Sequence, residues 1–282
     1  MKAGRIERRR FAGMNQHYKK YPLEFFLDAQ QRIGFETIEL WLGTPHFWLD
    51  SISYDDCRLV GRKVKARGLR VVAVTSPSLG YQYQYSPREA SHVEKSFRYF
   101  SNGIRAAAEL GAGIMTVNSG WGYANGDARE AFERSASLIA RLCDVAASEG
   151  VALALEPLTP LESNLVTDLA SAKRMFDEIA HPALKVMVDT VATGCAGETT
   201  AQWLEAFGPD LVHMHFVDGD RRTAAHYVWG DGACSLSEEL DRLEARGYAG
   251  YLTQEIDDGR YLANPVAADV ENMRSISDVA RN

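Results

Sequence analysis

The sequence predicts an α/β fold, a (β/α)8 TIM barrel formed by a single domain. Short apolar or β-branched runs alternate with longer helical patterns along the chain, which is typical of a parallel sheet wound through crossover helices. There are eight such runs, and 282 residues is an ordinary length for one barrel of this kind. No linker rich in Pro, Gly or Ser divides the chain, so we expect one domain over residues 1–282, with residues 1–9 as a flexible lead-in.

The strands are expected where apolar runs fall between turn residues. They are predicted at residues 10–15, 37–42, 70–76, 113–119, 152–158, 185–190, 211–218 and 250–256. The segments between them have helical periodicity, and several begin at Asp, Ser or Pro. Helices are predicted at residues 22–33, 55–67, 88–110, 128–149, 168–180, 199–207, 235–246 and 265–280. Four of these helices are followed by a glycine that can end a helix in the left-handed conformation: Gly34, Gly68, Gly111 and Gly247.

A dinucleotide-binding sheet is the main alternative to the barrel. It would use fewer strands and would carry GxGxxG after its first strand, and no such motif follows the run RFAGMN. The longest segments without regular pattern, 77–87 and 218–234, both follow the carboxyl ends of predicted strands. In a barrel these ends form the face that carries the chemistry.

The composition excludes several classes of function. The net charge of -7 argues against a nucleic-acid-binding protein, since phosphates normally require a basic surface. No apolar run approaches the ~18 residues that span a bilayer, and no apolar segment follows the basic start of the chain, so we expect a cytoplasmic protein without a membrane partner. The basic cluster at Arg5, Arg8, Arg9 and Arg10 is interpreted as a solvated lead-in.

The cysteines give no sign of a disulfide framework. Four are scattered through the chain without a CxxC pair: Cys57, Cys143, Cys195 and Cys234. We interpret them as ordinary thiols, and not as disulfides or zinc ligands.

Four consecutive predicted strands end in a side chain that can bind a hard metal ion. These residues are Glu156, Asp189, His215 and Glu255. A charge on a buried parallel strand is costly unless it is paired or bound to a cation, and three carboxylates on one face would repel one another. Pairing of each acid with a nearby Arg or Lys is the alternative explanation. Because the position recurs on neighbouring strands, we favour a catalytic divalent ion, with Mn²⁺ expected and Mg²⁺, Co²⁺ or Zn²⁺ as alternatives.

Several stretches resemble one known family. EPLTPLESNLV, VMVDT, HMHFVD, HYVWGDG, GYLTQEI and the earlier IGFETIELWLGTPH are similar to the signature stretches of the xylose-isomerase-like barrels. Within that family they most resemble the fructoselysine 3-epimerases and other ketose 3-epimerases. The likeness extends from about Phe11 onward and keeps the motifs in family order.

The resemblance implies roles for individual residues. The family's metal ligands match Glu156, Asp189, His215 and Glu255, and its acid and base match the two glutamates, Glu156 and Glu255. The family's substrate contacts match Glu162 and Arg221. One family histidine, three residues after the Asp ligand, is replaced here by Ala192, and His226 resembles a histidine of the fructoselysine enzymes that could substitute for it.

The implied reaction is inversion of C3 beside a C2 ketone. One carboxylate removes the C3 proton to give an enediolate, and the other returns a proton to the opposite face. A divalent ion would stabilise the charge on the substrate oxygens. If His215 is a ligand, the N–H of its other ring nitrogen should donate a hydrogen bond to a neighbouring acceptor. His213 is interpreted as a residue that fills the barrel interior.

Other residues on the same rim are weaker candidates for substrate contacts. Tyr81, Tyr83 and Tyr85 alternate after the third predicted strand and could form an apolar wall, which Trp121 could extend; a subunit contact is the alternative. His46, after the second strand, is a further candidate.

We therefore expect a metal-dependent ketose 3-epimerase that acts on a small sugar. A sugar or sugar-phosphate isomerase on the same site is the nearest alternative, and a metal phosphodiesterase of the endonuclease IV type or a non-catalytic binding module is less favoured. The expected partner is the substrate, with no nucleic acid, and the chain is expected to form a homo-oligomer, either a dimer or a tetramer.

Overall fold

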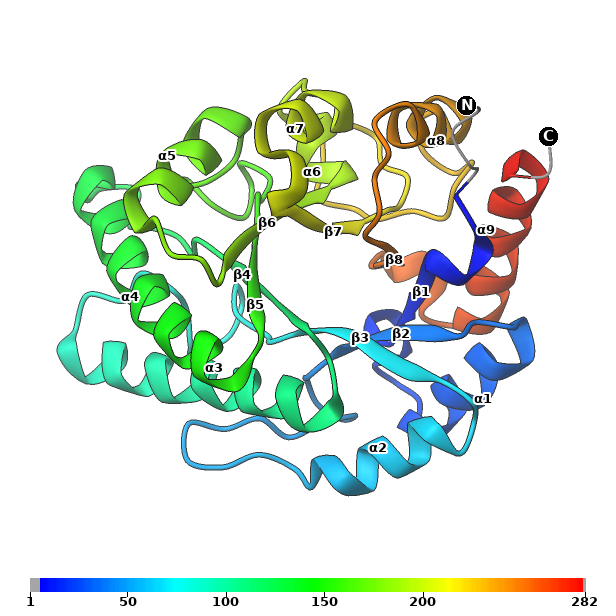
Figure 1. The fold of residues 1–282 in the computed structure, drawn as a ribbon, viewed down its shortest axis with the longest axis horizontal. Coiled ribbons are helices and arrows are strands. Elements are labelled where there is room, and N and C mark those ends of the chain that lie inside the picture. Colours follow the sequence, from blue (N-terminus) through cyan, green and yellow to red (C-terminus); the bar gives the residue numbers. More distant parts are fainter. Residues whose placement is uncertain (1–5, 281–282) are drawn as a thin grey trace.

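The computed structural model describes residues 6–280 and shows a closed barrel of parallel strands surrounded by helices (Figure 1). The strands are neighbours in chain order from β1 to β8, and β8 pairs with β1 to close the barrel. This confirms the predicted fold. The strands are β1 (Phe11–Met14), β2 (Thr37–Trp41), β3 (Arg70–Thr75), β4 (Ile114–Asn118), β5 (Ala152–Glu156), β6 (Leu184–Asp189), β7 (Leu211–His215) and β8 (Tyr251–Gln254).

Helices cover the outside of the barrel and bury their apolar faces against it (Figure 1). The α-helices are α1 (Leu23–Ile33), α2 (Cys57–Lys65), α3 (Ala90–Leu110), α4 (Ala128–Glu149), α5 (Leu169–Ile179), α6 (Thr190–Cys195), α7 (Thr200–Phe207), α8 (Leu236–Ala245) and α9 (Pro265–Ala280). Short 3-10 helices are η1 (Arg8–Arg10), η2 (Gln16–Tyr18), η3 (Gly208–Asp210) and η4 (Gly259–Tyr261).

The glycines predicted to end helices have the expected conformation. Gly34, Gly68, Gly111 and Gly247 have φ between +64° and +90°. Other residues rarely adopt this region, so glycine allows the chain to turn sharply from each helix toward the next strand.

Helix α6 was not predicted. It begins directly after Asp189, whose side chain accepts hydrogen bonds from the backbone N–H groups of Val191 and Ala192. The segment TVATGC is too short to show helical periodicity, and its start is fixed by a cap at the end of the preceding strand.

A buried polar cluster joins the first and the last elements of the barrel in chain order. Asp269 of α9 accepts hydrogen bonds from Tyr18, from Gln30 of α1 and from Gln254 of β8, with donor–acceptor distances of 2.5–2.6 Å. Nε2 of His17 lies 2.9 Å from Oδ1 of Asp269, the oxygen that also accepts from Gln254, and all of these side chains are buried. We call this set the Asp269 clasp; it connects the first and last strands through the C-terminal helix.

The structure describes residues 6–9 of the segment that was predicted to be a flexible lead-in, and this part contacts the barrel. Arg5 lies outside the described residues. Ile6 is buried, Arg8 donates a hydrogen bond to the carbonyl of Ile33, and Arg10 donates to the carbonyl of Gly250. An apolar anchor and two guanidinium contacts therefore hold this segment against the barrel.

Two further expectations concern the cysteines and the membrane. All four cysteines are free, with Cys57 and Cys143 buried in helices. Among the helices that the structure describes, none is long and apolar enough to cross a membrane.

Candidate metal and active site

The four predicted ligands converge at the carboxyl ends of their strands. Glu156, Asp189 and His215 are the last residues of β5, β6 and β7, and Glu255 directly follows β8. The parallel register places Asp189 opposite His215 across the β6–β7 pair. All four are buried, and each offers a donor atom within 4.8 Å of the others.

The contacts of His215 indicate that the four converging side chains suit a cation. Its Nδ1 lies 2.6 Å from Oε1 of Glu156 and 2.7 Å from Oε2 of Glu255, yet it makes no hydrogen bond to any described residue. Burial raises the pKa of Glu156 to about 7, and the attraction of His215 opposes that shift only in part. A ring nitrogen and several carboxylate oxygens around one point fit a divalent ion.

Asp189 is held in place from two sides. Its Oδ1 accepts hydrogen bonds from the N-terminus of α6, at 2.6 Å from the nitrogen of Val191, and its Oδ2 lies 2.7 Å from Nε2 of His226. Burial alone would raise the pKa of Asp189, but the attraction of His226 outweighs it and lowers the pKa. Asp189 is therefore an ionised carboxylate.

Glu39 is a buried residue beside the site that the sequence analysis missed. It lies in β2, and its carboxylate faces Nε2 of His213 at 2.7 Å and Nε2 of His215 at 3.3 Å. Thr75 of β3 donates a hydrogen bond to Oε1 at 2.5 Å. Burial would raise the pKa of Glu39, but the two histidines hold it well below its ordinary value. A glutamate within the apolar run TIELW was the available signal, because an unpaired charge there would be costly.

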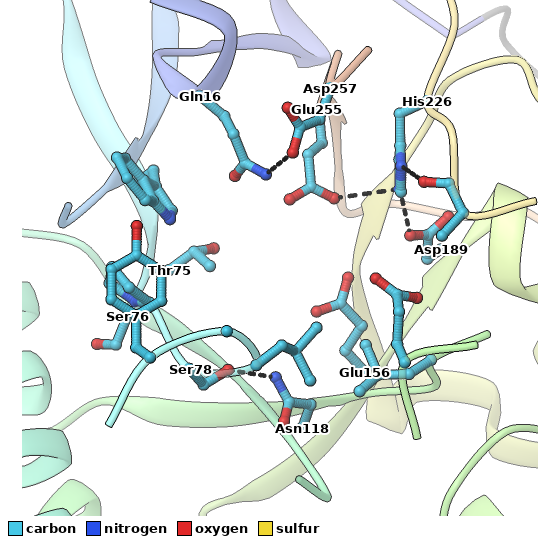
Figure 2. Close-up of a pocket in the computed structure, with 18 of the residues that line it drawn as sticks. Gln16, Thr75, Ser76, Ser78, Asn118, Glu156, Asp189, His226, Glu255 and Asp257 are labelled. Atoms are coloured by element: carbon cyan, nitrogen blue, oxygen red, sulfur yellow. Dashed lines mark hydrogen bonds and ion pairs between the residues drawn. The ribbon is translucent and has the colours of Figure 1, made fainter. Parts of the chain in front are cut away.

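A cavity of about 220 Å³ opens above the ligands (Figure 2). Glu156, Asp189 and Glu255 face it from one side, and Thr75 and Ser76 face it from the other. The sequence analysis did not single out several further lining residues, which follow or end other strands of the barrel: Gln16, Lys19, Trp41, Ser78, Asn118 and Asp257.

Three of the predicted substrate contacts line this cavity: Glu162, His226 and Tyr81. Oε2 of Glu162 accepts hydrogen bonds from the backbone N–H and the hydroxyl of Thr159, and burial raises the pKa of Glu162. His226 is carried by the loop after β7. Burial would lower its pKa, but the attraction of Asp189 raises it to about 10.

The loop that carries His226 is organised by Asp218. The Asp218 carboxylate accepts hydrogen bonds from the backbone N–H groups of Gly230, Gly232 and Cys234. An antiparallel bridge pairs His226 with Asp257 beyond β8. The loop is therefore held both at Asp189, through His226, and at the segment that follows β8.

The other three predicted contacts do not line the cavity. Arg221 lines a separate cavity of about 140 Å³ with α6 and α7, and its φ of +62° is the left-handed conformation. Both ring nitrogens of His46 are engaged, by the amide of Asn15 and the carbonyl of Tyr21, each at 2.8 Å. Trp121 packs edge-on against Tyr123.

The predicted wall of three tyrosines is wrong. Tyr83 and Tyr85 are buried, and their rings stack on Tyr99 and Phe100 of α3 with centroids 4.2 and 3.9 Å apart. Only Tyr81 reaches the cavity. The segment is a loop, so side chains at alternate positions need not share one face as they do in a strand. Because the rings of Tyr83 and Tyr85 are buried within the chain, they are also not available for a subunit contact.

The family comparison decides where this barrel belongs. The model of the xylose isomerase-like TIM barrel matches residues 27–278, nearly the whole chain. The chain belongs to the xylose isomerase-like TIM-barrel family. Its site has the location that this barrel uses for chemistry, at the carboxyl ends of the strands.

Proteins that are similar to this chain include several epimerases. Fructoselysine 3-epimerase of Shigella flexneri is 26% identical over 239 residues, covering 85% of this chain and 87% of the relative. The crystal structure of 3-keto-D-glucoside 4-epimerase from E. coli superposes with a TM-score of 0.79 at 18% identity, covering 95% of this chain and 99% of that one. The structure of L-ribulose 3-epimerase gives 0.78 at 19% identity, with 96% and 95% covered. The similarity to fructoselysine 3-epimerase supports an isomerase of the epimerase type, and the two solved structures show the same fold.

Proposed function

We propose that this protein is a metal-dependent ketose 3-epimerase whose substrates include ketoses that carry an amino-acid substituent, as in fructoselysine. The observation that carries the proposal is the convergence of Glu156, Asp189, His215 and Glu255 beneath one cavity. The similarity to fructoselysine 3-epimerase supports the choice of reaction and of substrate.

The residues present fit one divalent ion. Glu156, Asp189, His215 and Glu255 would hold it, and when bound it would supply positive charge that stabilises negative charge on substrate oxygens. Mn²⁺ is our choice of ion, because three carboxylates and one imidazole suit a hard or borderline cation.

Glu156 and Glu255 would move the proton. They come from β5 and from the end of β8, and both line the cavity, so they reach a bound ketose from different strands of the rim. One would remove the proton from C3 and the other would return a proton to the opposite face.

An ion pair at the cavity supports an amino-acid substituent. Nζ of Lys19 lies 3.1 Å from Oδ1 of Asp257, both side chains line the cavity, and 36% and 35% of their surfaces are exposed. An ammonium and a carboxylate side by side match the opposite charges of an α-amino acid. Gln16 donates a hydrogen bond to Asp257 and orients it (Figure 2).

A cytoplasmic location and a homo-oligomeric state, dimer or tetramer, remain parts of this proposal, as does the absence of a nucleic-acid partner. The net charge of -7 supports the last of these. Light scattering of the purified protein measures the oligomeric state.

Hydrogen exchange tests the reaction. The protein is incubated with Mn²⁺ in D₂O and a panel of ketoses that includes fructoselysine, and deuterium incorporation is followed by NMR. We expect deuterium at C3 together with inversion there. Deuterium at C1 or C2 instead would indicate an aldose–ketose isomerase, and no exchange into any ketose, with or without metal, would contradict the proposal.

Two variants test the carboxylates. E156Q and E255Q should each reduce exchange at C3 by about 10³-fold or more, because each removes a group that transfers the proton. E178Q changes an exposed glutamate of α5 and is the matched control, with exchange at the wild-type rate. Wild-type exchange in E156Q combined with E255Q would refute the two-base mechanism.

A further inference from the structure

The interior of the barrel contains a second group of titratable side chains, beneath the proposed cation site. Glu39, His213 and His215 lie close enough together to be considered as ligands of an ion themselves, and all three are fully buried. The proposed reaction uses only His215 from this group. The role of the other two residues is therefore open.

The contacts of Glu39 define which nitrogens carry hydrogen. An ionised carboxylate only accepts hydrogen bonds. Its Oε1 accepts from the hydroxyl of Thr75 and faces Nε2 of His215, and its Oε2 faces Nε2 of His213 at 2.7 Å. Each facing ring nitrogen must then be the protonated one, because an unprotonated nitrogen would place a lone pair against a carboxylate oxygen.

This arrangement leaves the opposite nitrogen of His215 free to bind. Nδ1 points toward Glu156 and Glu255 at 2.6 and 2.7 Å and has no hydrogen-bond partner among the described residues. A neutral imidazole with hydrogen on Nε2 has its lone pair on Nδ1. That lone pair is directed at the point where the carboxylates converge.

The remaining contacts hold the Glu39 carboxylate in position. The Thr75 hydroxyl lies 2.8 Å from that of Thr116 on β4, which links β3 and β4 to Glu39. On the other side, Nε2 of His213 lies 3.2 Å from the hydroxyl of Thr253 on β8. Both oxygens of Glu39 are therefore fixed, and rotation of the carboxylate would break bonds on each side.

We infer that Glu39, held by His213 and Thr75, is a positioning residue that fixes the Nε2–H form of His215 and so directs Nδ1 to the cation. The inference rests on the proposed function, since it requires that His215 bind the ion. Glu39 and His213 do not bind a second ion: their oxygens and nitrogens are within hydrogen-bonding distance of each other, and Nε2 of His215 carries a hydrogen.

Metal titration tests this role without measuring activity. Mn²⁺ is titrated into metal-free wild type, E39Q, E39L and T116V, and stoichiometry and Kd are measured by calorimetry. E39Q keeps the shape of the side chain and one acceptor but removes the charge, whereas E39L removes both acceptors. We expect one ion per chain, with Kd about 10-fold higher in E39Q and about 100-fold higher in E39L. T116V should stay within about 2-fold of wild type, because it alters only the outer link to Thr75.

Histidine ¹⁵N NMR of the Zn²⁺-loaded protein provides the readout that a merely structural role would not change. We expect hydrogen on Nε2 of His215 in wild type and T116V, and loss of this single form in E39Q. H213Q, which removes the other partner of Glu39, should shift Kd in the same direction as E39Q. Far-UV circular dichroism identifies any variant that does not fold, and E39Q then carries the test in place of E39L.

Three outcomes would overturn the inference, and they differ in what they leave standing. Equal Kd and an equal His215 form in E39Q and wild type would refute the role of Glu39 while the metal centre stands. Two ions per chain, one of them lost in H213Q, would show that Glu39 and His213 are ligands. A wild-type chain that binds no divalent ion would refute both the inference and the proposed function.

Discussion

Glu162 is placed by a turn that its own carboxylate stabilises. Its Oε2 accepts hydrogen bonds from the N–H and hydroxyl of Thr159, at 3.1 and 2.8 Å, and the side chain lines the cavity. Arg221 lies in the neighbouring cavity beside Gly194 and Cys234. The two residues should therefore differ in their effect on catalysis.

We expect E162Q to lower kcat/KM for the ketose by about 10- to 100-fold, since a charge-assisted hydrogen bond to substrate contributes about 1.5–3 kcal/mol. R221M should change kcat/KM by less than about 3-fold, because Arg221 lines the separate cavity and not the one above the proposed ligands. Steady-state kinetics of both variants measures the difference. A large loss in R221M with no loss in E162Q would contradict the placement of both side chains.

The strand-end ligands could be predicted because a charge at the end of a buried strand repeats on neighbouring strands. The same cost of burial applies to Glu39, but it lies within its strand and has no equivalent on the adjacent ones. Arg221 and His46 were misplaced for a different reason. Loop side chains follow the local backbone, such as the left-handed conformation of Arg221, which sequence spacing does not reveal.

At the scale of elements, helices of eight residues or more could be predicted, whereas the six-residue helix α6 could not. Helix α6 depends on a hydrogen bond to Asp189, and the tyrosine loop depends on stacking against α3. The cap is a local hydrogen bond and the stacking is a tertiary contact, and neither leaves a periodic pattern in the sequence.

An ion pair joins helices α1 and α2 at the surface. Nζ of Lys63 lies 2.5 Å from Oε1 of Glu24, with 34% and 45% of the side chains exposed. The hydrogen bond from Lys63 lowers the pKa of Glu24. A lowered pKa in the folded state stabilises the protein above the ordinary pKa of the carboxyl, and this contribution is lost as the pH falls through the folded value.

We therefore expect K63M to lower the free energy of unfolding by only about 0.5 kcal/mol at pH 7, since solvent screens the pair. The difference from wild type should shrink as the pH falls through the lowered pKa of Glu24 and Glu24 becomes protonated. Urea unfolding at neutral and at acidic pH measures it, and K65M, an exposed lysine of the same helix, is the control. A difference that grows at acidic pH would show that the pair is not its source.

At the scale of the whole molecule, the Asp269 clasp holds the barrel closed. Its carboxylate oxygens face the donors of Tyr18, Gln30 and Gln254 and the ring nitrogen of His17, all buried. D269N would turn an amide N–H₂ toward groups that donate, leaving buried donors unsatisfied.

We expect D269N to lower the free energy of unfolding by about 2–4 kcal/mol, measured from the midpoint of urea unfolding. E271Q changes an exposed residue of the same helix and should stay within about 0.5 kcal/mol of wild type. Equal midpoints for D269N and wild type would show that the clasp does not stabilise the barrel.

The clasp can form only late in protein synthesis, because its partners lie at opposite ends of the chain. His17 and Asp269 are 252 residues apart in sequence, so at roughly 5–20 residues per second the ribosome adds the second about 13–50 s after the first. Strand β8 ends only 15 residues before Asp269, so for most of this time the β1 edge has no β8 beside it, and an unpaired edge is where chains associate wrongly. The seam between β1 and β8 is thus the last part of the barrel to form and the part that a nascent chain must keep covered longest.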